Sequence, residues 1–332
     1  MHCELIVPGL FSEPARARVP ALELLLCRGR ASSAASRSLE AWLHDAFGLE
    51  REPFAAGALT LLAAGGEPGE ACWARADPVH LRLMRDRLIV APSAAFKLSL
   101  EEAQALVEAL NRHFGGALSL QVVEADRWCA RLDSDLAFDA AAPIEVAGRD
   151  VDVTLRIGGE AGKRWGQLLN EAQMLLHAHP VNQAREARGD AAVNSLWLWG
   201  VGRAPKLSGS RWQSVSAADP VALGLAKLAG ARPRPLPESA QAWLARAPED
   251  GRHLIVLDAL RAPLALGQTA EYSECVEVLE SRWFAPLLAA LRGGRVGMIT
   301  VAVPDCAGAS FETIRGDLRR FWRRRKGLEA YA

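Results

Sequence analysis

His179–Pro180–Val181–Asn182 begins the stretch that decides the fold, near the middle of a chain of 332 residues. The residues that follow it at fixed spacing are Arg185, Gly189, Asn194, Gly200, Gly202 and Pro205. A proline after His179 favours the first turn of a helix, because its fixed φ suits that position and its missing N–H has no partner there. Gly189 is a typical helix terminator. The run therefore predicts a helix end followed by a second, short helix.

Length and composition restrict the class of protein. The length indicates about two domains with ample room for a core, and half of the residues are apolar, which excludes a mainly disordered chain. The chain has 39 basic residues (Lys and Arg) and 39 acidic residues (Asp and Glu). With no net charge, it could bind nucleic acid, a membrane or acidic substrates only through a local patch. We find no membrane-spanning or signal segment and expect a cytoplasmic protein, with six reduced cysteines outside any CxxC pair.

Apolar runs alternate between strand and helix patterns at both ends of the chain. We expect strands at residues 4–8, 59–62, 253–257 and 296–303, and helices at 21–26 and 272–291. A parallel sheet suits this alternation. The proline-rich residues 232–237 predict a stiff connector or a surface loop. A Gly/Pro break at residues 65–69 indicates a domain boundary near residue 70.

The middle of the chain has the pattern of a separate unit. Strands are expected at residues 88–90, 118–123 and 151–157, and helices at 100–114 and 162–177. Ser99 and Glu102 have the spacing of a capping box before the first of these helices. This pattern predicts a small sheet covered on one face by helices.

The spacing after His179 resembles that of archaeal-type cofactor-independent phosphoglycerate mutases of the alkaline phosphatase superfamily. The family carries an Arg just before the first glycine of its Gly-x-Gly pair, where this chain has Trp199. The resemblance implies an α/β fold with an alkaline phosphatase-like, mainly parallel sheet flanked by helices. That discontinuous domain would comprise residues 1–70 and 206–332, and residues 71–205 would form an inserted smaller α+β domain. The combination also resembles the RpfE-type regulatory proteins, degenerate relatives of those mutases.

The resemblance implies a site with two divalent metals, held by Asp and His ligands around a Ser or Thr nucleophile. The first ligand position offers no acid after Ile6, and the later ones offer only Asp258 and the pair Asp305–Cys306. We therefore predict no metal site and no catalytic residue, with Asp258, Asp305 and Cys306 as vestigial candidates. Asp305 is either a relic ligand or a loop acid. The serines Ser32, Ser33, Ser36 and Ser38 lack the nucleophile's context and are expected to be caps and turns.

Six side chains are candidates for holding a small anionic ligand in an interdomain cleft. They are His179, Asn182, Arg185, Asn194, Trp199 and Arg203. The fork of donors on arginine suits a carboxylate or phosphate. The alternative is structural, with Asn182 and Asn194 satisfying loop backbone and Trp199 in a core.

Residues 311–326 predict a basic amphipathic helix, because Ile314, Leu318, Phe321 and Trp322 have helical spacing. Its cations include Arg319, Arg320, Arg323, Arg324, Arg325 and Lys326. Such a helix could bind nucleic acid or an anionic membrane, or it could dock through its apolar stripe.

Three functional hypotheses remain open. The first is a non-catalytic pseudoenzyme that regulates or binds a ligand, with a small anion or a protein as its partner and no cofactor. The second is a metal-dependent phosphomutase or phosphatase with non-standard ligands, which would need a divalent metal. The third is a nucleic-acid-binding regulator that uses the basic C-terminal residues.

Overall fold

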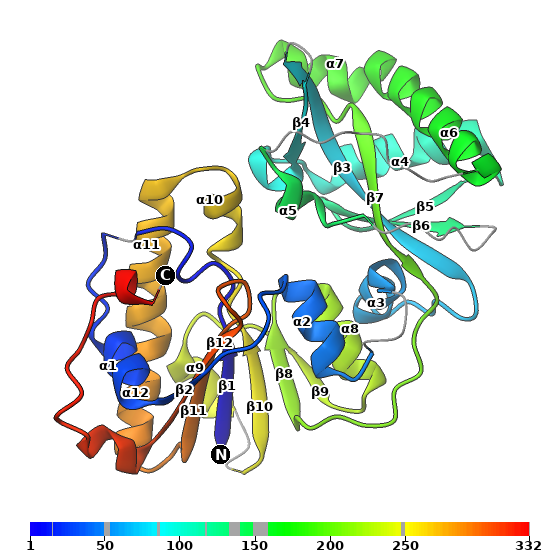
Figure 1. Cartoon of the computed structure of the whole chain (residues 1–332). Helices are drawn as coiled ribbons and strands as arrows, with labels where there is room; N and C mark the ends of the chain where they lie inside the picture. The colour runs from blue at the N-terminus through cyan, green and yellow to red at the C-terminus, as the bar shows by residue number, and fades with distance from the viewer. Residues whose placement is uncertain are drawn as a thin grey trace. The chain divides into compact units, whose positions relative to one another are not determined.

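The computed structural model describes residues 1–14, 16–49, 54–84, 87–116, 118–132, 140–148, 159–246 and 250–331. The chain forms two compact units (Figure 1). Unit 1 contains Met1–Glu50 and Lys206–Ala332, and unit 2 contains Arg51–Pro205. Within the described residues, no helix is long and apolar enough to cross a membrane. All six cysteines are free thiols.

Unit 1 is built on a seven-stranded sheet in the order β2-β12-β11-β1-β10-β8-β9. The strands are β1 (His2–Ile6), β2 (Arg30–Ser32), β8 (Ser214–Ala217), β9 (Arg232–Pro235), β10 (Arg252–Val256), β11 (Met298–Val303) and β12 (Ala309–Ile314). β1 lies between β10 and β11 and pairs in parallel with both. The strands expected at residues 4–8, 253–257 and 296–303 are therefore confirmed as neighbours in one mainly parallel sheet.

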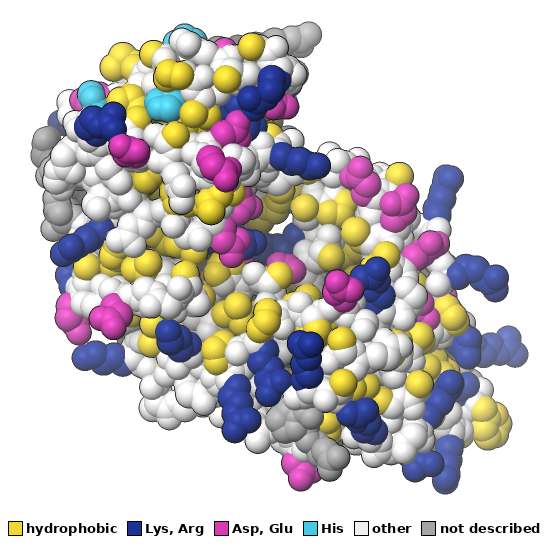
Figure 2. Space-filling model, turned by 180° about the vertical axis from the view of Figure 1, so that it is seen from behind, with side chains coloured by type: hydrophobic (Ala, Val, Ile, Leu, Met, Phe, Trp, Pro, Cys, Tyr) yellow, Lys and Arg dark blue, Asp and Glu magenta, His cyan; other side chains and the backbone are white. Residues whose placement is uncertain are grey.

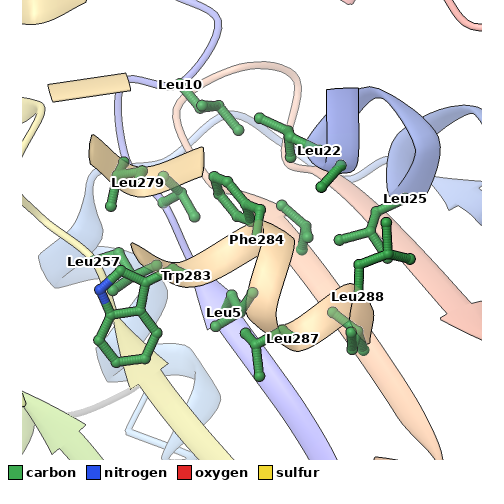
Figure 3. Packing of buried hydrophobic residues seen from close by; sticks show 14 of the residues in the cluster. Leu5, Leu10, Leu22, Leu25, Leu257, Leu279, Trp283, Phe284, Leu287 and Leu288 are labelled. Carbon is green, nitrogen blue, oxygen red and sulfur yellow. The ribbon is translucent and has the colours of Figure 1, made fainter. Parts of the chain in front are cut away.

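Helices flank this sheet (Figure 1). They are α1 (Pro20–Arg28), α2 (Leu39–Ala46), α8 (Pro220–Leu228), α9 (Ala240–Arg246), α10 (Arg261–Ala265), α11 (Thr269–Leu279) and α12 (Ala285–Arg292). The helix expected at residues 272–291 is confirmed, although a π-helical turn at Glu280–Phe284 joins α11 to α12. Figure 3 shows Phe284 and Leu287 of this segment close to Leu5 of β1, in one fully buried cluster. Burial of such side chains is the main force that holds helix and sheet together.

Unit 2 is built on a five-stranded antiparallel sheet, in which β3 pairs with β4, β6 and β7. Its strands are β3 (Cys72–Met84), β4 (Arg87–Pro92), β5 (Ser119–Glu124), β6 (Arg127–Leu132) and β7 (Ser195–Gly202). Its helices are α3 (Ala56–Ala63), α4 (Leu100–Phe114), α5 (Pro143–Val146), α6 (Gly159–Ala178) and α7 (Pro180–Ala187). The helices expected at residues 100–114 and 162–177 are confirmed, and the strand expected at 151–157 lies outside the described residues.

Both faces of the unit 2 sheet are covered. Alternate side chains of a strand point to opposite faces, so Cys72 and Ala74 join a core with α4 and α6, whereas Trp73 packs with α3. The capping box at Ser99 and Glu102 is present at the start of α4. The sequence predicted helices on one face and missed α3 on the other.

The expected strand at residues 59–62 is wrong, since these residues lie in helix α3. A short apolar run does not distinguish a strand from a buried helix, and the alanines around it favour helix. Gly57 lets α3 approach β3 closely, because a Cβ there would lie 2.3 Å from the backbone carbon of Ala74.

Two expectations near the end of unit 1 are also wrong. The amphipathic helix expected at residues 311–326 is replaced by β12 and a 3-10 turn at Arg315–Arg319. The buried Phe311 and Thr313 alternate with exposed side chains, and β12 pairs with both β11 and β2. These two features favour a strand over a helix. The connector expected at residues 232–237 contains β9, whose prolines are tolerated because β9 is an edge strand.

Candidate functional site

The carboxyl edge of the unit 1 sheet gathers acidic residues. β1, β8, β10 and β11 run parallel, so their carboxyl ends meet at one edge. Asp219 follows β8, Asp258 follows β10 and Asp305 follows β11. Ligands of open α/β sheets bind at such edges, which makes this edge the first candidate site.

Asp305 holds the loop that follows β1. Its Oδ2 accepts hydrogen bonds from Gly9 N at 2.7 Å and from Ser12 Oγ at 3.4 Å. Gly9 has φ of 82°, a left-handed conformation that glycine adopts without strain. Burial raises the pKa of Asp305, and the bond from Gly9 opposes that rise. The arrangement favours the interpretation of Asp305 as a loop acid.

The neighbouring candidates serve local structure as well. Cys306 Sγ donates to the carbonyl of Tyr331 at 3.6 Å. Ser36 Oγ donates to the carbonyl of Asp305 at 2.7 Å, and Ser38 caps α2. Caps and turns were expected for Ser32, Ser33, Ser36 and Ser38, and Ser38 confirms that expectation as the N-cap of α2. Ser32 instead lies in strand β2, and Ser36 bonds backbone that is distant in the sequence.

Three charged residues at this edge were missed by the sequence analysis. Arg261 Nη2 lies 2.7 Å from Glu40 Oε1, and their side chains are only 16% and 10% exposed. Asp219 Oδ1 accepts from Ala222 N at 2.8 Å and so caps α8. In the sequence Asp219 and Glu40 have the pattern of helix starts. Glu40 and Arg261 are 221 positions apart, and no signal in the sequence pairs them.

The electrostatics of this edge are set by burial. Burial raises the pKa of Asp219 to about 6, and the carboxylates of Asp258 and Glu40 add to the rise. The Arg261 guanidinium acts in the opposite direction on the pKa of both Asp219 and Asp305. Arg261 is therefore the cation that compensates this group of acids.

The residues at the edge do not fit a two-metal centre. Across the part of the chain that the structure describes, no three His, Cys, Asp or Glu side chains are grouped to hold a metal ion. Two-metal phosphoryl transfer needs such clustered ligands on both ions. The positive charge at this edge is instead supplied by Arg261, which is paired with Glu40.

In unit 2, His179, the first residue of the stretch His179–Asn182, has a helix-capping role. His179 Nδ1 accepts from Val181 N at 3.2 Å, with Pro180 in the first turn of α7. Burial lowers the pKa of His179, which favours the neutral ring that can accept this bond. The predicted helix end followed by a short helix is confirmed, with Gly189 directly after the last turn.

Asn182 is a buried clamp on the backbone. Its Nδ2 donates to the carbonyls of Leu176 at 2.8 Å and Val193 at 2.7 Å. Its Oδ1 accepts from Val193 N at 2.9 Å, and the residue is 1% exposed. The expectation that Asn182 satisfies loop backbone is confirmed.

Arg185 is equally buried and ties α7 to the start of α4. Its Nε donates to Ala191 O at 2.9 Å and its Nη2 to Lys97 O at 2.8 Å. Its Nη1 lies 2.6 Å from Oε2 of Glu102, the capping-box residue. All three nitrogens of the fork thus bond groups of unit 2.

The remaining candidates lie on or beside β7. Asn194 accepts from Leu81 N at 2.7 Å and donates to Leu81 O at 2.8 Å, which prolongs the ladder between β7 and β3. Trp199 is buried and its Nε1 donates to Asp77. Arg203 is exposed, and its Nη1 donates to Glu70 O.

The structure brings some of the six candidates together. His179, Asn182 and Arg185 share α7, and Asn182 is joined to Asn194 through the backbone of Val193. Trp199 and Arg203 lie farther along the chain, at β7 and just after it. Arg203 is the exposed member of the group, and His179 and Asn194 are half-buried.

No known family model matches the chain. The chain is 31% identical over 118 residues to a 2,3-bisphosphoglycerate-independent phosphoglycerate mutase from Methanosarcina barkeri, a match to 35% of this chain and 29% of that protein. A second such mutase, from Methanothermobacter thermautotrophicus, is 30% identical over 83 residues, which are 23% of this chain and 21% of that protein. The matched segments thus span less than a third of these curated relatives.

Two solved structures are similar over nearly the whole chain. One is a cofactor-independent phosphoglycerate mutase from Thermoplasma acidophilum, with a TM-score of 0.51, 16% identity and coverage of 100% of this chain and 94% of that chain. The other is the PH0037 protein from Pyrococcus horikoshii, with a TM-score of 0.59, 12% identity and coverage of 94% and 87%. The homologues and structural neighbours are cofactor-independent phosphoglycerate mutase-like. The mixed α/β fold of the chain resembles the phosphoglycerate mutase fold.

Proposed function

We propose that the chain is a phosphoglycerate mutase-like pseudoenzyme with a degenerate metal site, a regulatory or ligand-binding protein of the RpfE type. The observation that carries the proposal is that polar side chains at the carboxyl edge of unit 1 are bonded to other groups of the protein. Asp305 is bonded to the loop after β1, Cys306 to Tyr331, and Arg261 to Glu40. The sequence placed the boundary of the inserted domain at residue 71, but α3 packs on the unit 2 sheet, so we propose that unit 2, Arg51–Pro205, is the inserted domain. We further propose that the protein acts in the cytoplasm without a cofactor.

The chemical reason is the charge requirement of the reaction. Two divalent ions close together need carboxylate and imidazole ligands that offset their repulsion. Arg261 already compensates part of the acidic charge at this edge, and a metal ion beside it would be repelled. Loss of turnover is therefore the expected outcome, rather than a change of substrate.

One observation favours the enzyme alternative, a metal-dependent phosphomutase or phosphatase with non-standard ligands. The pKa of Asp219 is raised to about 6, near the range in which a carboxyl group transfers protons at neutral pH. A divalent metal would then have to be held by Asp258, Asp305 and Cys306 together with further groups.

Activity and metal content together decide between these proposals. We expect no interconversion of 2- and 3-phosphoglycerate by the purified protein with added manganese, zinc or magnesium. Elemental analysis should find fewer than two tightly held ions for each chain. Metal-stimulated mutase or phosphatase turnover that disappears in Asp305→Ala would overturn the pseudoenzyme proposal and support the enzyme.

We also propose that a small anionic ligand binds at Arg203, the exposed member of the six candidates, with His179 and Asn194 as half-buried neighbours in the sequence motif, and not at the buried side chains of Asn182, Arg185 and Trp199. The fork of Arg203 supports this role best, because it is the exposed guanidinium among the six. Calorimetric titration with 3-phosphoglycerate tests it. Loss of binding in Arg203→Gln with an unchanged melting temperature supports recognition, whereas equal binding by the variant and the wild type contradicts it.

A further inference from the structure

Residues 319–326 form a surface segment that the proposed function does not use. Its sequence is Arg319–Arg320–Phe321–Trp322–Arg323–Arg324–Arg325–Lys326, so all of its residues are cationic or aromatic. We name it the cationic–aromatic loop. Phe321 is 81% exposed and Trp322 is 67% exposed. Two large aromatic side chains in water are costly for a folded chain, and a contiguous pair of them typically marks an interaction site.

The loop is fixed to unit 1 at its start. Arg320 Nη1 donates to Arg28 O at 3.0 Å, and Arg323 Nη1 donates to Gly29 O at 2.7 Å. These carbonyls lie at the C-terminal end of α1, where cations are favoured by the helix dipole. Arg320 also pairs with Asp317 at 2.8 Å. Two of the cations therefore position the loop.

The loop is fixed at its other end as well. Leu328 is 7% exposed and belongs to the core of unit 1. The ring of Tyr331 stacks on Phe11, with the ring centroids 5.7 Å apart. Exposure of Phe321 and Trp322 is therefore built into the fold, because structured residues hold the loop on both sides.

The charge of the loop selects an anionic partner. Acidic residues are absent from the sequence between Asp317 and Glu329, while the chain as a whole has a net charge of zero. Arg319, Arg324, Arg325 and Lys326 are exposed. Figure 2 shows Lys and Arg side chains gathered at the lower right, beside an exposed hydrophobic group. A local cationic field of this kind attracts polyanions and anionic surfaces.

The geometry of the two rings distinguishes between such partners. The planes of Phe321 and Trp322 are 81° apart, with ring centroids at 5.4 Å. Successive bases of a single-stranded nucleic acid stack on the faces of aromatic rings, and two perpendicular neighbouring rings do not offer faces to successive parallel bases. Insertion into a lipid interface depends on apolar area and on flanking cations, and it sets no such requirement on ring orientation.

We propose that the cationic–aromatic loop docks this protein on an anionic phospholipid surface. Phe321 and Trp322 insert at the level of the headgroups, and Arg324 and Arg325 contact lipid phosphates. Each cation near an anionic membrane contributes a few-fold in affinity at physiological salt. This role goes beyond the proposed function and is independent of the carboxyl edge.

Co-sedimentation of the full chain with vesicles tests the proposal. Binding is expected with phosphatidylcholine–phosphatidylserine vesicles, and it should weaken with phosphatidylcholine alone or at high salt, where charges are screened within a few Å. Arg324→Gln/Arg325→Gln should lower the partition coefficient by about tenfold or more, and Phe321→Ser/Trp322→Ser should also lower it severalfold. All four side chains are exposed, so the melting temperature should stay unchanged.

Matched controls lie elsewhere on unit 1. Arg282→Gln/Arg292→Gln removes two exposed cations outside the loop. Val278→Ser replaces an apolar residue that is 46% exposed with a polar one. Both should bind vesicles like the wild type. The proposal fails if the controls lose binding equally, or if wild-type protein ignores anionic vesicles. It also fails if the protein binds oligo(dT) through Arg324 and Arg325 and does not bind vesicles, which would identify a nucleic-acid partner.

Discussion

Trp199 donates its indole N–H to Oδ2 of Asp77 at 2.7 Å, from β7 to the neighbouring strand β3. Arg75, directly opposite Trp199 in the strand register, places its guanidinium 5.3 Å from the indole ring and bonds Asp77 Oδ1. The resembled mutases have an arginine where this chain has Trp199. Here the neighbouring guanidinium belongs to β3, and it is buried against Asp77.

We predict that Trp199→Phe destabilises unit 2 by about 1–3 kcal/mol, because it removes one donor from the buried carboxylate of Asp77. Trp199→Arg should destabilise more, since it places a second buried cation beside Arg75. Urea denaturation of both variants measures this. A Trp199→Arg variant as stable as the wild type would show that this buried site tolerates a second cation beside Arg75 and Asp77.

Asn182 provides a sharper test of the clamp in unit 2. Asn182→Asp keeps the size of the side chain and replaces the donor Nδ2, which faces two carbonyls, with an acceptor. We expect Asn182→Asp to lower the free energy of unfolding by at least as much as Asn182→Ala, which should lower it by about 2–4 kcal/mol. Asn194→Ala, at a half-buried position, should cost less. Thermal melts decide, and a well-tolerated Asn182→Asp would show that the amide is not needed as a donor.

Asp219 predicts a defined pH dependence. Its pKa is raised by burial from the ordinary value of 3.8 to about 6, so the folded state favours the protonated form. This group therefore lowers stability as the pH rises from about 4 through 6. Asp219→Asn keeps an N-cap for α8 and removes the charge, so it should be more stable than the wild type by about 1–3 kcal/mol above about pH 7.

Urea titrations at several pH values measure that difference. It should shrink to nearly zero below about pH 4, where the wild-type carboxyl group is protonated in both states. Asp250→Asn, at an exposed position, serves as the control and should show a small difference at every pH. An Asp219→Asn advantage that is constant with pH would contradict the electrostatic cause.

The pair Arg261–Glu40 should behave as a largely buried ion pair. Arg261→Gln leaves Glu40 without its compensating cation and should destabilise unit 1 by about 3–5 kcal/mol. The double variant Arg261→Gln/Glu40→Gln should recover a large part of that loss, because no isolated charge remains. Chemical denaturation of the two single variants and the double variant gives the coupling energy, and strictly additive effects would contradict a direct pair.

Local signals in the sequence were sufficient where a few neighbouring residues decide the structure. The capping box at Ser99 and the helix start at Pro180 depend on contacts within a few residues, and both were predicted. The helical spacing at residues 311–326 predicted a helix, but pairing of β12 with β11 and β2 makes its first residues, Phe311–Ile314, part of a strand. The ion pair of Arg261 and Glu40 could not be predicted either, because residues far apart in the sequence meet only in the completed fold.

The position of β1 in the sheet has a consequence for synthesis of the chain. Both neighbours of β1 come from far along the sequence, since His2 is paired with Arg252 and Met298. At typical translation rates, the ribosome needs roughly 10 to 60 seconds to produce the intervening residues. Throughout that time the apolar first strand has no partner in its own sheet, whereas every strand of unit 2 is made before β10 appears. The nascent chain therefore exposes an aggregation-prone edge that a chaperone or the early folding of unit 2 would have to protect.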